Sequence, residues 1–343
     1  MRVAVVGATG AVGSIMLRVL EERRFPASEV VPFASERSVG RRLAFGGGEL
    51  EVRALTPEDI QGFDIAIFSA GGSTSGEWAP RFAEAGCVVV DNSSRWRMEA
   101  GVPLVVSEVN PDDLDNHRGI VANPNCSTMQ MVVALKPIDV VAGIERLVIT
   151  TMQSVSGTGQ KAVEGLHAET EAALEAKEIP PPTAYPHQIA FNVIPQAGNF
   201  PEGSDYTDEE LKLVNETRKI LGRPDIAVSA TCTRVPVYTS HSESVNVQTR
   251  EPLSADDCRA LLARSPGLTV LDDPAQALYP LAIDAAGRDD VLVGRIREDP
   301  SHPRALNLFV VADNLRKGAA TNAVQIAELL VERGLVRARP QAA

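Results

Sequence analysis

Cysteine is the most reactive residue type in this chain, and it occurs four times, at positions 87, 126, 232 and 258. Cys126 differs from the others because the polar segment Asn-Pro-Asn-Cys-Ser-Thr (123–128) surrounds it and an apolar helical pattern follows. A cysteine at a helix N-terminus lies at the positive end of the helix dipole, which lowers the pKa of its thiol. Because the thiolate is the nucleophilic form, the sequence favours Cys126 as a nucleophile of covalent catalysis.

The other three cysteines lack such a setting. Cys87 and Cys232 lie in apolar strand patterns, where a cysteine is usually a small buried hydrophobic residue. Cys258 lies at an exposed-looking helix start, where the preceding aspartates disfavour a thiolate. The N-terminal pattern is that of a strand entering a turn and not of a secretory leader, so we interpret all four as reduced thiols of a cytoplasmic protein.

A second chemical signal is the glycine-rich segment Gly-Ala-Thr-Gly-Ala-Val-Gly at 7–13, which follows an apolar run and precedes a helical pattern. Such a turn lets the backbone and the free N–H groups of a helix N-terminus approach a pyrophosphate. The segment therefore predicts dinucleotide binding. The residues expected at the pyrophosphate are Gly7, Thr9, Gly10, Ala11 and Val12.

The next apolar run ends in Ala-Ser-Glu-Arg-Ser at 34–38, which bears on the choice of dinucleotide. Arg37 with Ser35 and Ser38 suits the 2′-phosphate of NADP, because a guanidinium forks onto phosphate oxygens. Glu36 is the acid that would instead hold the ribose 2′-hydroxyl of NAD. We favour NADP; a solvated turn with a surface arginine is the alternative.

The elements that must position these residues fall into two patterns. Short apolar runs alternate with helical patterns in the N-terminal part, which predicts a Rossmann-type doubly wound parallel sheet. The expected strands are 2–6, 30–33, 64–68, 87–91 and 119–122, with a helix-like segment around 75–85.

The pattern changes near residue 125, and the C-terminal part predicts an α+β domain with a mixed sheet. A helix at 126–136 is expected to stop at Pro137, because proline cannot continue the backbone ladder. A last helix at 314–333 is expected to complete the N-terminal domain, and the tail after about residue 334 is expected to fray. The remaining expected elements are strands 144–154, 226–237, 243–250, 291–298 and 305–312 and helices 158–177 and 208–221.

Composition excludes several classes of protein. The chain has 343 residues, 44% of them hydrophobic and 23% charged, which fits a globular protein of about two domains. Its net charge of −12 disfavours nucleic acid as a partner. No apolar run approaches the roughly 20 residues of a membrane span. Neither C-x-x-C nor H-E-x-x-H occurs, so no metal site is expected.

Eight segments, in order along the chain, resemble those of the aspartate-semialdehyde dehydrogenase family, and they are spread over nearly the whole chain. They are GATGAVG (7–13), ASERS (34–38), DNSSRWR (91–97), NPNCST (123–128), QSVSGTG (153–159), EELK (209–212), the segment 234–241 and DNLRKGAA (313–320). The resemblance implies interconversion of L-aspartate 4-semialdehyde and L-4-aspartyl phosphate with NADP and inorganic phosphate. It also implies a place in lysine, methionine, threonine and diaminopimelate biosynthesis.

The resemblance assigns a role to each matching residue. Cys126 would form the acyl-thioester, His241 would be the general acid/base, and Gln153 would orient the substrate. Gln153 could equally be the polar end of a buried strand. Asn125 would either stabilise the oxyanion with its amide or only cap the helix. The family also implies a homodimer or a tetramer, with domain limits of 1–125 plus 314–333 for NADP binding and 126–313 for catalysis and dimerisation.

The charged residues follow the same resemblance. Arg234 would clamp the substrate carboxylate, Arg95 and Lys212 would bind phosphate, and Glu209 would receive the substrate ammonium. Glu210 is adjacent to Glu209, so the match to the family's carboxylate could be off by one residue. The alternative for Glu209 and Lys212 is an ordinary i, i+3 surface pair. The residues expected at the nicotinamide end of the cofactor are Ser156, Gly157 and Asn314.

Three other classes fit less well. N-acetyl-γ-glutamyl-phosphate reductases usually carry glycine before the cysteine, where this chain has Asn125. A short-chain dehydrogenase needs tyrosine four residues before lysine, and none of the four tyrosines has lysine there. A non-catalytic NADP-binding protein would need neither Cys126 nor His241.

Overall fold

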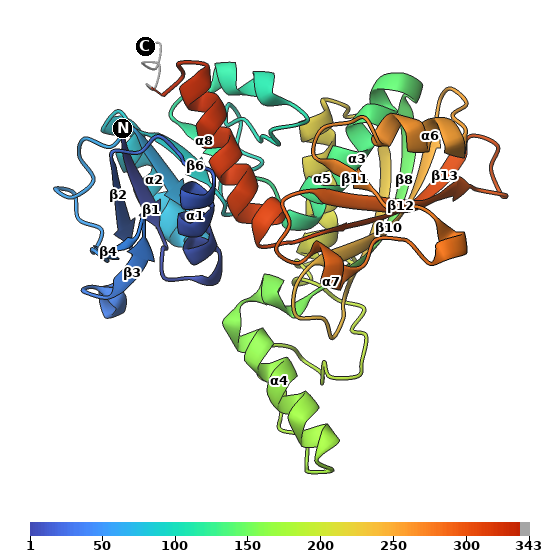
Figure 1. The fold of residues 1–343 in the computed structure, drawn as a ribbon, viewed down its shortest axis with the longest axis horizontal. Helices are drawn as coiled ribbons and strands as arrows, with labels where there is room; N and C mark the ends of the chain where they lie inside the picture. The colour runs from blue at the N-terminus through green and yellow to red at the C-terminus, as the bar shows by residue number, and fades with distance from the viewer. Residues whose placement is uncertain (337–343) are drawn as a thin grey trace. The chain divides into compact units, whose positions relative to one another are not determined.

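The computed structural model describes residues 1–336, which form two units (Figure 1). One unit comprises Met1–Asn125 together with the described residues from Ala319 onward, and the other comprises Cys126–Gly318. Most of the tail that we expected to fray, residues 337–343, lies outside the described residues. Within residues 1–336, no helix combines the length and apolar character that a membrane crossing requires.

The N-terminal unit contains a five-stranded sheet whose neighbouring strands are all parallel, in the order β2-β1-β5-β6-β7. Nearly every strand residue is buried, because helices cover both faces. The prediction of a doubly wound parallel sheet is therefore confirmed. The strands are β1 (Arg2–Val6), β2 (Glu29–Phe33), β5 (Ile65–Phe68), β6 (Val88–Asp91) and β7 (Ile120–Ala122).

Three helices supply the two layers of this unit. Helices α1 (Ala11–Glu22) and α8 (Asn322–Glu332), the latter red in Figure 1, pack on one face in a common apolar core. Helix α2 (Gly72–Glu84) covers the other face, where the rings of Phe68 and Phe82 meet edge to face at 5.4 Å. A hairpin of β3 (Arg42–Phe45) and β4 (Gly48–Glu51) was not predicted; its strands have four residues each and are largely exposed.

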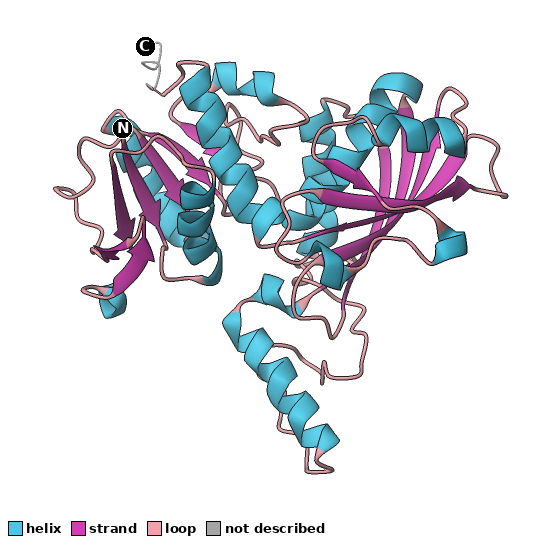
Figure 2. Cartoon of the chain, viewed as in Figure 1, coloured by secondary structure: helices cyan, strands magenta, loops and turns pink. Residues whose placement is uncertain are grey.

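The second unit contains a mixed six-stranded sheet in the order β11-β12-β13-β10-β8-β9 (Figure 2). Its strands β8 and β9 are parallel, while β10 is antiparallel to both β8 and β13. The predicted α+β class is confirmed. The strands are β8 (Ile144–Gln153), β9 (Ala227–Arg234), β10 (His241–Thr249), β11 (Leu268–Val270), β12 (Val291–Glu298) and β13 (Ala305–Ala312).

Helices α3 (Cys126–Ala142), α5 (Asp208–Leu221) and α6 (Ala255–Leu262) pack against this sheet. Helix α4 (Gln160–Leu174) extends away from it with the loop that follows, and α7 (Ala282–Ala285) lies near β13 (Figure 2). Along β8 and β10, buried residues alternate with more exposed ones, so one sheet face is covered and the other is partly open.

Two predicted helix limits were wrong. Helix α3 continues through Pro137 to Ala142, because Ile138 and Ala142 are buried beyond the proline and their packing offsets the lost backbone hydrogen bond. The last helix does not run evenly from 314. It starts as a π-helical segment, Arg316–Thr321, in which the Gly318 N–H donates to the Asp313 carbonyl at 3.1 Å, and only then becomes α8.

The register of the mixed sheet gathers four chain segments at one of its ends. Gln153 closes β8 beside Arg234, which closes the parallel strand β9. His241 opens the antiparallel strand β10 and pairs with Ala312, the last residue of β13. The side chains that follow these strand ends, such as Ser154 after β8 and Asn314 after β13, therefore lie at the same end of the sheet.

Candidate active site

Cys126 is the first residue of α3, and it is the only partly accessible cysteine of the four. Burial raises the pKa of Cys258 to about 12 and that of Cys87 well above its usual value. Cys258 is fully buried, so the expectation of an exposed helix start there was wrong; its side chain lies on the inner face of α6. The backbone of Gly318 lies against Cys126, where an added Cβ would come within 2.8 Å of the Cys126 Cβ.

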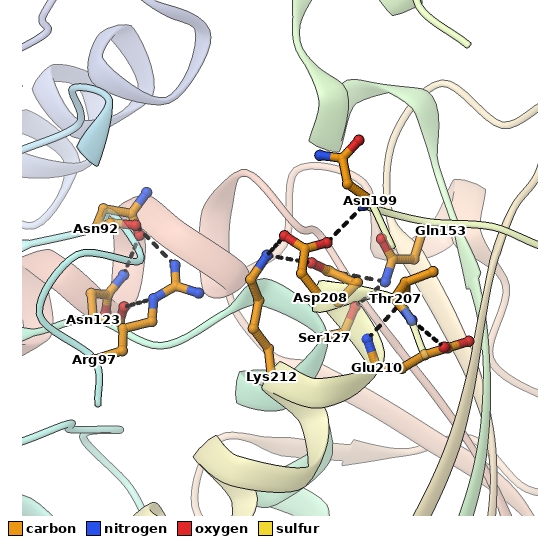
Figure 3. A network of polar contacts seen from close by, with 11 residues as sticks. Asn92, Arg97, Asn123, Ser127, Gln153, Asn199, Thr207, Asp208, Glu210 and Lys212 are labelled. Carbon is orange, nitrogen blue, oxygen red and sulfur yellow. Dashed lines mark hydrogen bonds and ion pairs between the residues drawn. The ribbon is translucent and has the colours of Figure 1, made fainter. Parts of the chain in front are cut away.

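A chain of polar contacts begins at Ser127, the residue that follows Cys126 (Figure 3). The Gln153 amide donates to the Ser127 Oγ at 3.0 Å and to a carboxylate oxygen of Glu209 at 3.2 Å. The other oxygen of Glu209 accepts from Lys212 Nζ at 3.2 Å. Burial alone would lower the pKa of Lys212, but the carboxylates of Glu209 and Asp208 outweigh burial and raise it.

The start of α5 separates the two adjacent glutamates. Glu210 forms a capping box with Thr207: its carboxylate accepts the Thr207 N–H at 2.8 Å, and its own N–H donates to the Thr207 Oγ1 at 3.2 Å (Figure 3). Its second oxygen accepts the Cys232 N–H at 2.9 Å. Glu210 is thus fully engaged in local structure, whereas Glu209 contacts Gln153 and Lys212.

Arg234 is a buried guanidinium with donors to spare. Its Nη1 donates to the Ser154 carbonyl at 2.7 Å, and its guanidinium carbon lies 5.8 Å from the centre of the Tyr185 ring. Its backbone is fixed by reciprocal hydrogen bonds with Ile194. Its Nε has no hydrogen-bond partner among the described residues. A buried cation of this geometry is suited to bind an anion, a carboxylate above all.

His241 is fully buried, and its two ring nitrogens have different surroundings. The backbone N–H of Ser154 donates to Nδ1 at 3.0 Å, whereas Nε2 has no partner among residues 1–336. Burial, with a further contribution from the Arg234 charge, lowers the pKa of His241 to about 3. The backbone of Gly157 packs closely against the ring, since an added Cβ would come within 3.1 Å of Nε2.

Asn314 organises the segments around this histidine. Its Oδ1 accepts the Ser240 N–H at 2.9 Å and the Ser154 hydroxyl at 3.1 Å, and its Nδ2 donates to the Ser156 Oγ at 3.0 Å. Ser240 has a φ of 76°, in the left-handed region that favours glycine. This strained residue turns the chain into β10 directly before His241.

In the N-terminal unit, the glycine-rich turn has the cradle that a dinucleotide pyrophosphate needs. The N–H groups of Gly7 and Ala8 donate to the Phe33 carbonyl, which fixes the turn at the ends of β1 and β2. An added Cβ at Gly7 would come within 2.4 Å of the Ser69 carbonyl oxygen, so only glycine allows this approach. No acidic residue lies in the first turn of α1, which keeps its N-terminus suited to an anion.

The segment after β2 lies beside this turn, and Thr9 Oγ1 donates to the Ser38 Oγ at 3.4 Å. Ser35, Glu36 and Arg37 are exposed there. Arg95, also in the N-terminal unit, has its guanidinium carbon 4.4 Å from the centre of the Trp96 ring and pairs with Glu99 at 3.1 Å.

Sequence reasoning missed Arg97, two residues beyond Arg95. Its buried guanidinium donates to the carbonyls of Asn123 and Asn92 at 3.0 Å each (Figure 3). The Asn322 amide holds the Asn123 Oδ1 at 2.7 Å. These contacts fix the segment that leads to Asn125 and Cys126. The only sequence signal was a second arginine in the 91–97 segment.

Glu243 was also missed. It is fully buried on β10, two residues from His241 and on the same sheet face, and neither carboxyl oxygen has a hydrogen-bond partner among the described residues. Burial raises the pKa of Glu243 well above its usual value, despite a contribution from the Gln130 side chain in the opposite direction. Burial therefore favours the protonated form of Glu243 over the carboxylate.

Comparisons with known proteins define the class to which this fold and site belong. Residues 2–117 match the family model for the NAD-binding domain of semialdehyde dehydrogenases, and residues 135–317 match the model for their dimerisation domain. These matches place the chain among the semialdehyde dehydrogenases, a class of oxidoreductases.

Individual relatives narrow the class. The chain is 56% identical to aspartate-semialdehyde dehydrogenase of Aquifex aeolicus, covering 98% of this chain and 99% of the relative, and 54% identical to that of Legionella pneumophila, covering 98% and 97%. The crystal structure of aspartate semialdehyde dehydrogenase II from Vibrio cholerae superposes with a TM-score of 0.92 at 49% identity, covering 96% of this chain and 98% of that one. The chain therefore belongs to the aspartate-semialdehyde dehydrogenase family, a family of oxidoreductases, as the resemblance predicted.

Proposed function

We propose that this protein interconverts L-aspartate 4-semialdehyde and L-4-aspartyl phosphate, with NADP and inorganic phosphate, through an acyl-thioester on Cys126. One observation carries the proposal. At one end of the mixed sheet, the half-buried Cys126 is linked through Ser127 and Gln153 to Glu209, and the buried Arg234 and His241 close the neighbouring strands. A thiolate, an anion clamp, a cation partner and an imidazole are what this reaction requires.

The steps follow from thiolate chemistry. The Cys126 thiolate attacks the aldehyde carbon, a C–S bond forms, and the carbonyl electron pair moves to oxygen. That pair then re-forms the carbonyl as the hydride leaves the carbon, so Cys126 carries a thioester. NADP, when bound, accepts the hydride. A phosphate oxygen attacks the thioester, the C–S bond breaks and the thiolate leaves; biosynthesis runs these steps in reverse.

Charged residues would hold the substrate for this chemistry. Arg234 would bind the α-carboxylate with its spare donors, and Glu209 would receive the ammonium, as its contact with Gln153 in the site supports. Gln153 would orient the reacting carbonyl beside Cys126. Lys212, which keeps partial exposure, and Arg95 would bind phosphate.

Asn125 and His241 would act at the reacting oxygen. Asn125 is buried directly before Cys126, which leaves both alternatives open: an amide donor to the oxyanion or a helix cap. His241 would be the general acid/base of the family. A relative from Vibrio cholerae, 48% identical, has been solved as a complex with ASA, which supports this substrate class for the present chain.

For the cofactor we propose NADP. Gly7, Thr9, Gly10, Ala11 and Val12 would hold the pyrophosphate, and Ser35, Arg37 and Ser38 would hold the 2′-phosphate. The contact between Thr9 and Ser38 supports this grouping. Ser156, Gly157 and Asn314 would lie toward the nicotinamide. A relative from Candida albicans, 26% identical with a TM-score of 0.74, has been solved with NADP.

We further propose the domain limits, the location, the oligomeric state and the pathway that the family implies. The NADP-binding domain would comprise 1–125 and 314–333, and the catalytic and dimerisation domain 126–313. The protein would be a cytoplasmic homodimer, or a tetramer, of lysine, methionine, threonine and diaminopimelate biosynthesis. The match to a dimerisation domain and the partly open face of the mixed sheet support self-association.

The test is the oxidative assay with aspartate semialdehyde, phosphate and NADP, followed by NADPH absorbance. Replacement of phosphate by sulfate, of NADP by NAD, and of Cys126 by alanine are the three controls. We expect activity that requires phosphate, prefers NADP and disappears in Cys126→Ala. A folded wild-type protein without activity on this substrate would contradict the proposal.

A further inference from the structure

The Arg234 guanidinium has two contacts within its own unit, and one of them is an aromatic ring to which the proposed reaction gives no part. Its Nη1 donates to the Ser154 carbonyl at 2.7 Å, and its Cζ lies over the Tyr185 ring, 5.8 Å from the ring centre. We infer that Tyr185 is a positioning residue, whose ring orients Arg234 for the carboxylate of the substrate. The inference deepens the proposed function and rests on it, since that function assigns the carboxylate to Arg234.

The Tyr185 ring is a suitable partner for a cation. A guanidinium within about 6 Å of an aromatic ring centre is attracted to the negative face of the ring, more strongly where water is excluded. Arg234 is only 6% exposed and Tyr185 is half-buried, so the contact is largely shielded from water. Burial raises the pKa of Tyr185, although the Arg234 charge and the hydrogen bond to Thr158 act in the opposite direction. The phenol therefore keeps its proton at neutral pH.

The hydroxyl of Tyr185 connects the ring with a segment beside the site. It donates to the Thr158 Oγ1 at 2.9 Å. Thr158 is the last residue of the short 3₁₀ helix η3 (Val155–Thr158). Gly157 of the same helix packs near the guanidinium, since an added Cβ would come within 3.3 Å of the Arg234 Nη1. Arg234 thus contacts both η3 and the Tyr185 ring, and the hydroxyl bond holds these two neighbours together.

The loop that carries Tyr185 is also fixed through its main chain. The buried carboxylate of Glu169, on α4, accepts two successive N–H groups of this loop at 2.8 and 2.9 Å. Further along the loop, Ile194 exchanges two backbone hydrogen bonds with Arg234, at 2.8 and 2.9 Å. Tyr185 itself packs against the small apolar core that α4 and the loop share. The ring is therefore held from its backbone and from its hydroxyl.

A guanidinium held in this way is better prepared to bind a carboxylate. The Ser154 carbonyl fixes one nitrogen of Arg234, but a single hydrogen bond leaves the plane of the guanidinium free to tilt about that contact. A ring against the guanidinium restricts the tilt, so the donors that do not bond Ser154 keep one orientation. Less conformational freedom is then lost when the carboxylate binds. We expect loss of the ring to weaken substrate binding and to leave the chemical steps at Cys126 unchanged.

The first test separates the ring from its hydroxyl. Tyr185→Leu removes the ring, whereas Tyr185→Phe and Thr158→Val keep the ring and remove the hydrogen bond. We expect Tyr185→Leu to raise KM for aspartate semialdehyde about three- to tenfold, the range for one cation–π contact, with kcat and the KM values for phosphate and NADP unchanged. Tyr185→Phe and Thr158→Val should each raise KM less. Tyr279→Leu, at another half-buried tyrosine of the same unit, is the matched control and should have wild-type kinetics.

Three results of this test would overturn the inference. They are an unchanged KM in Tyr185→Leu, a rise in Tyr185→Phe as large as that in Tyr185→Leu, and a loss of kcat without a change in KM. If Tyr185→Leu does not fold, Tyr185→Met provides the same comparison, because methionine fills irregular space without an aromatic face.

A double-mutant cycle tests whether Tyr185 acts through Arg234. We compare the effect of Tyr185→Leu on kcat/KM in the wild type and in an Arg234→Gln background, which has no guanidinium for the ring to orient. Residues that act through one contact have non-additive effects, so we expect Tyr185→Leu to lower kcat/KM by less than about twofold in Arg234→Gln. An equal loss in both backgrounds would show a general structural role and would overturn the inference.

A measurement without turnover separates this inference from the proposed function. Phenylglyoxal adds to arginine guanidinium groups, and the mass of the peptide that contains Arg234 reports this addition in the unliganded protein. We expect Arg234 to react at least about threefold faster in Tyr185→Leu than in wild type, because one face of the guanidinium loses its cover, while the other arginines react at their wild-type rates. An unchanged Arg234 rate would overturn the inference on any substrate. A faster rate in a protein whose wild type does not oxidise aspartate semialdehyde would support the contact and contradict only the proposed function.

Discussion

Gly318 provides the sharpest test of how the fold positions Cys126, the proposed nucleophile. An added Cβ at this position would lie 2.8 Å from the Cys126 Cβ and 3.3 Å from its Cα, whereas ordinary contacts begin near 3.4 Å. Gly318→Ala must therefore displace Cys126 or the π-helical segment by about 0.6 Å or more. Such overpacking costs about 1–3 kcal/mol, partly offset by the roughly 1 kcal/mol that alanine contributes over glycine in a helix. A displacement approaching 1 Å at a reacting atom lowers the rate by up to about 10²-fold.

We therefore expect Gly318→Ala to lose about 10- to 100-fold in kcat with a small change in Tm. The assay is NADPH formation at saturating substrate, combined with thermal unfolding and with the rate of Cys126 alkylation. The matched control is Gly48→Ala in the β3–β4 hairpin, where an added Cβ makes only an ordinary contact at 3.8 Å with the Phe45 carbonyl. Wild-type kcat in a folded Gly318→Ala protein would show that the close approach has no catalytic consequence.

Three further variants test separate features. Burial raises the pKa of Glu243, so the native state binds this proton more tightly than the unfolded state, and stability falls as pH rises above 4.5. Glu243→Gln should remove that loss of stability, which is at most about 1.4 kcal/mol per pH unit. Parallel curves of Tm against pH for the variant and the wild type would contradict this prediction. Ser240→Gly should raise the free energy of unfolding by about 0.5–1 kcal/mol, because the backbone strain relieved at a φ of 76° exceeds the entropy that glycine adds to the unfolded chain. A lower free energy of unfolding in a denaturant titration would argue against strain at this residue. Arg234→Lys should raise KM for the semialdehyde at least about tenfold, because a lysine ammonium cannot donate to the Ser154 carbonyl and at the same time bind both oxygens of a carboxylate. An unchanged KM would show that the substrate carboxylate binds elsewhere.

The fold class was predictable because local and global signals agree. The runs at 3–6, 65–68 and 87–90 are continuously apolar, which is the composition that a strand covered on both faces requires. The alternation in 244–248 likewise matched a sheet with one covered face. Element limits were less predictable, because the end of α3 beyond Pro137 depends on burial that only the folded unit provides.

The resemblance singled out the side chains that we propose to react, but the contacts around these side chains could not be predicted. Nothing in the residue type of Ser154 indicates that its peptide N–H contacts His241, since a main-chain donor is present at almost every position. The burial of Cys258 and the raised pKa of Glu243 have the same origin: both depend on which face of an element turns inward. The Arg97 guanidinium donates to the carbonyls of Asn92 and Asn123 at 3.0 Å each. These carbonyls follow β6 and β7, so they converge only when the two strands are paired.

The central claim is that Cys126 carries the acyl group between hydride transfer and phosphate attack. The most direct measurement mixes the enzyme with aspartate semialdehyde and NADP in the absence of phosphate, counts the NADPH formed, and determines the mass of the peptide that contains Cys126. We expect a rapid burst of one NADPH per active site, then a slow phase, and an aspartyl adduct on Cys126 that phosphate removes. Steady turnover without phosphate, or a burst that leaves Cys126 unmodified, would contradict it.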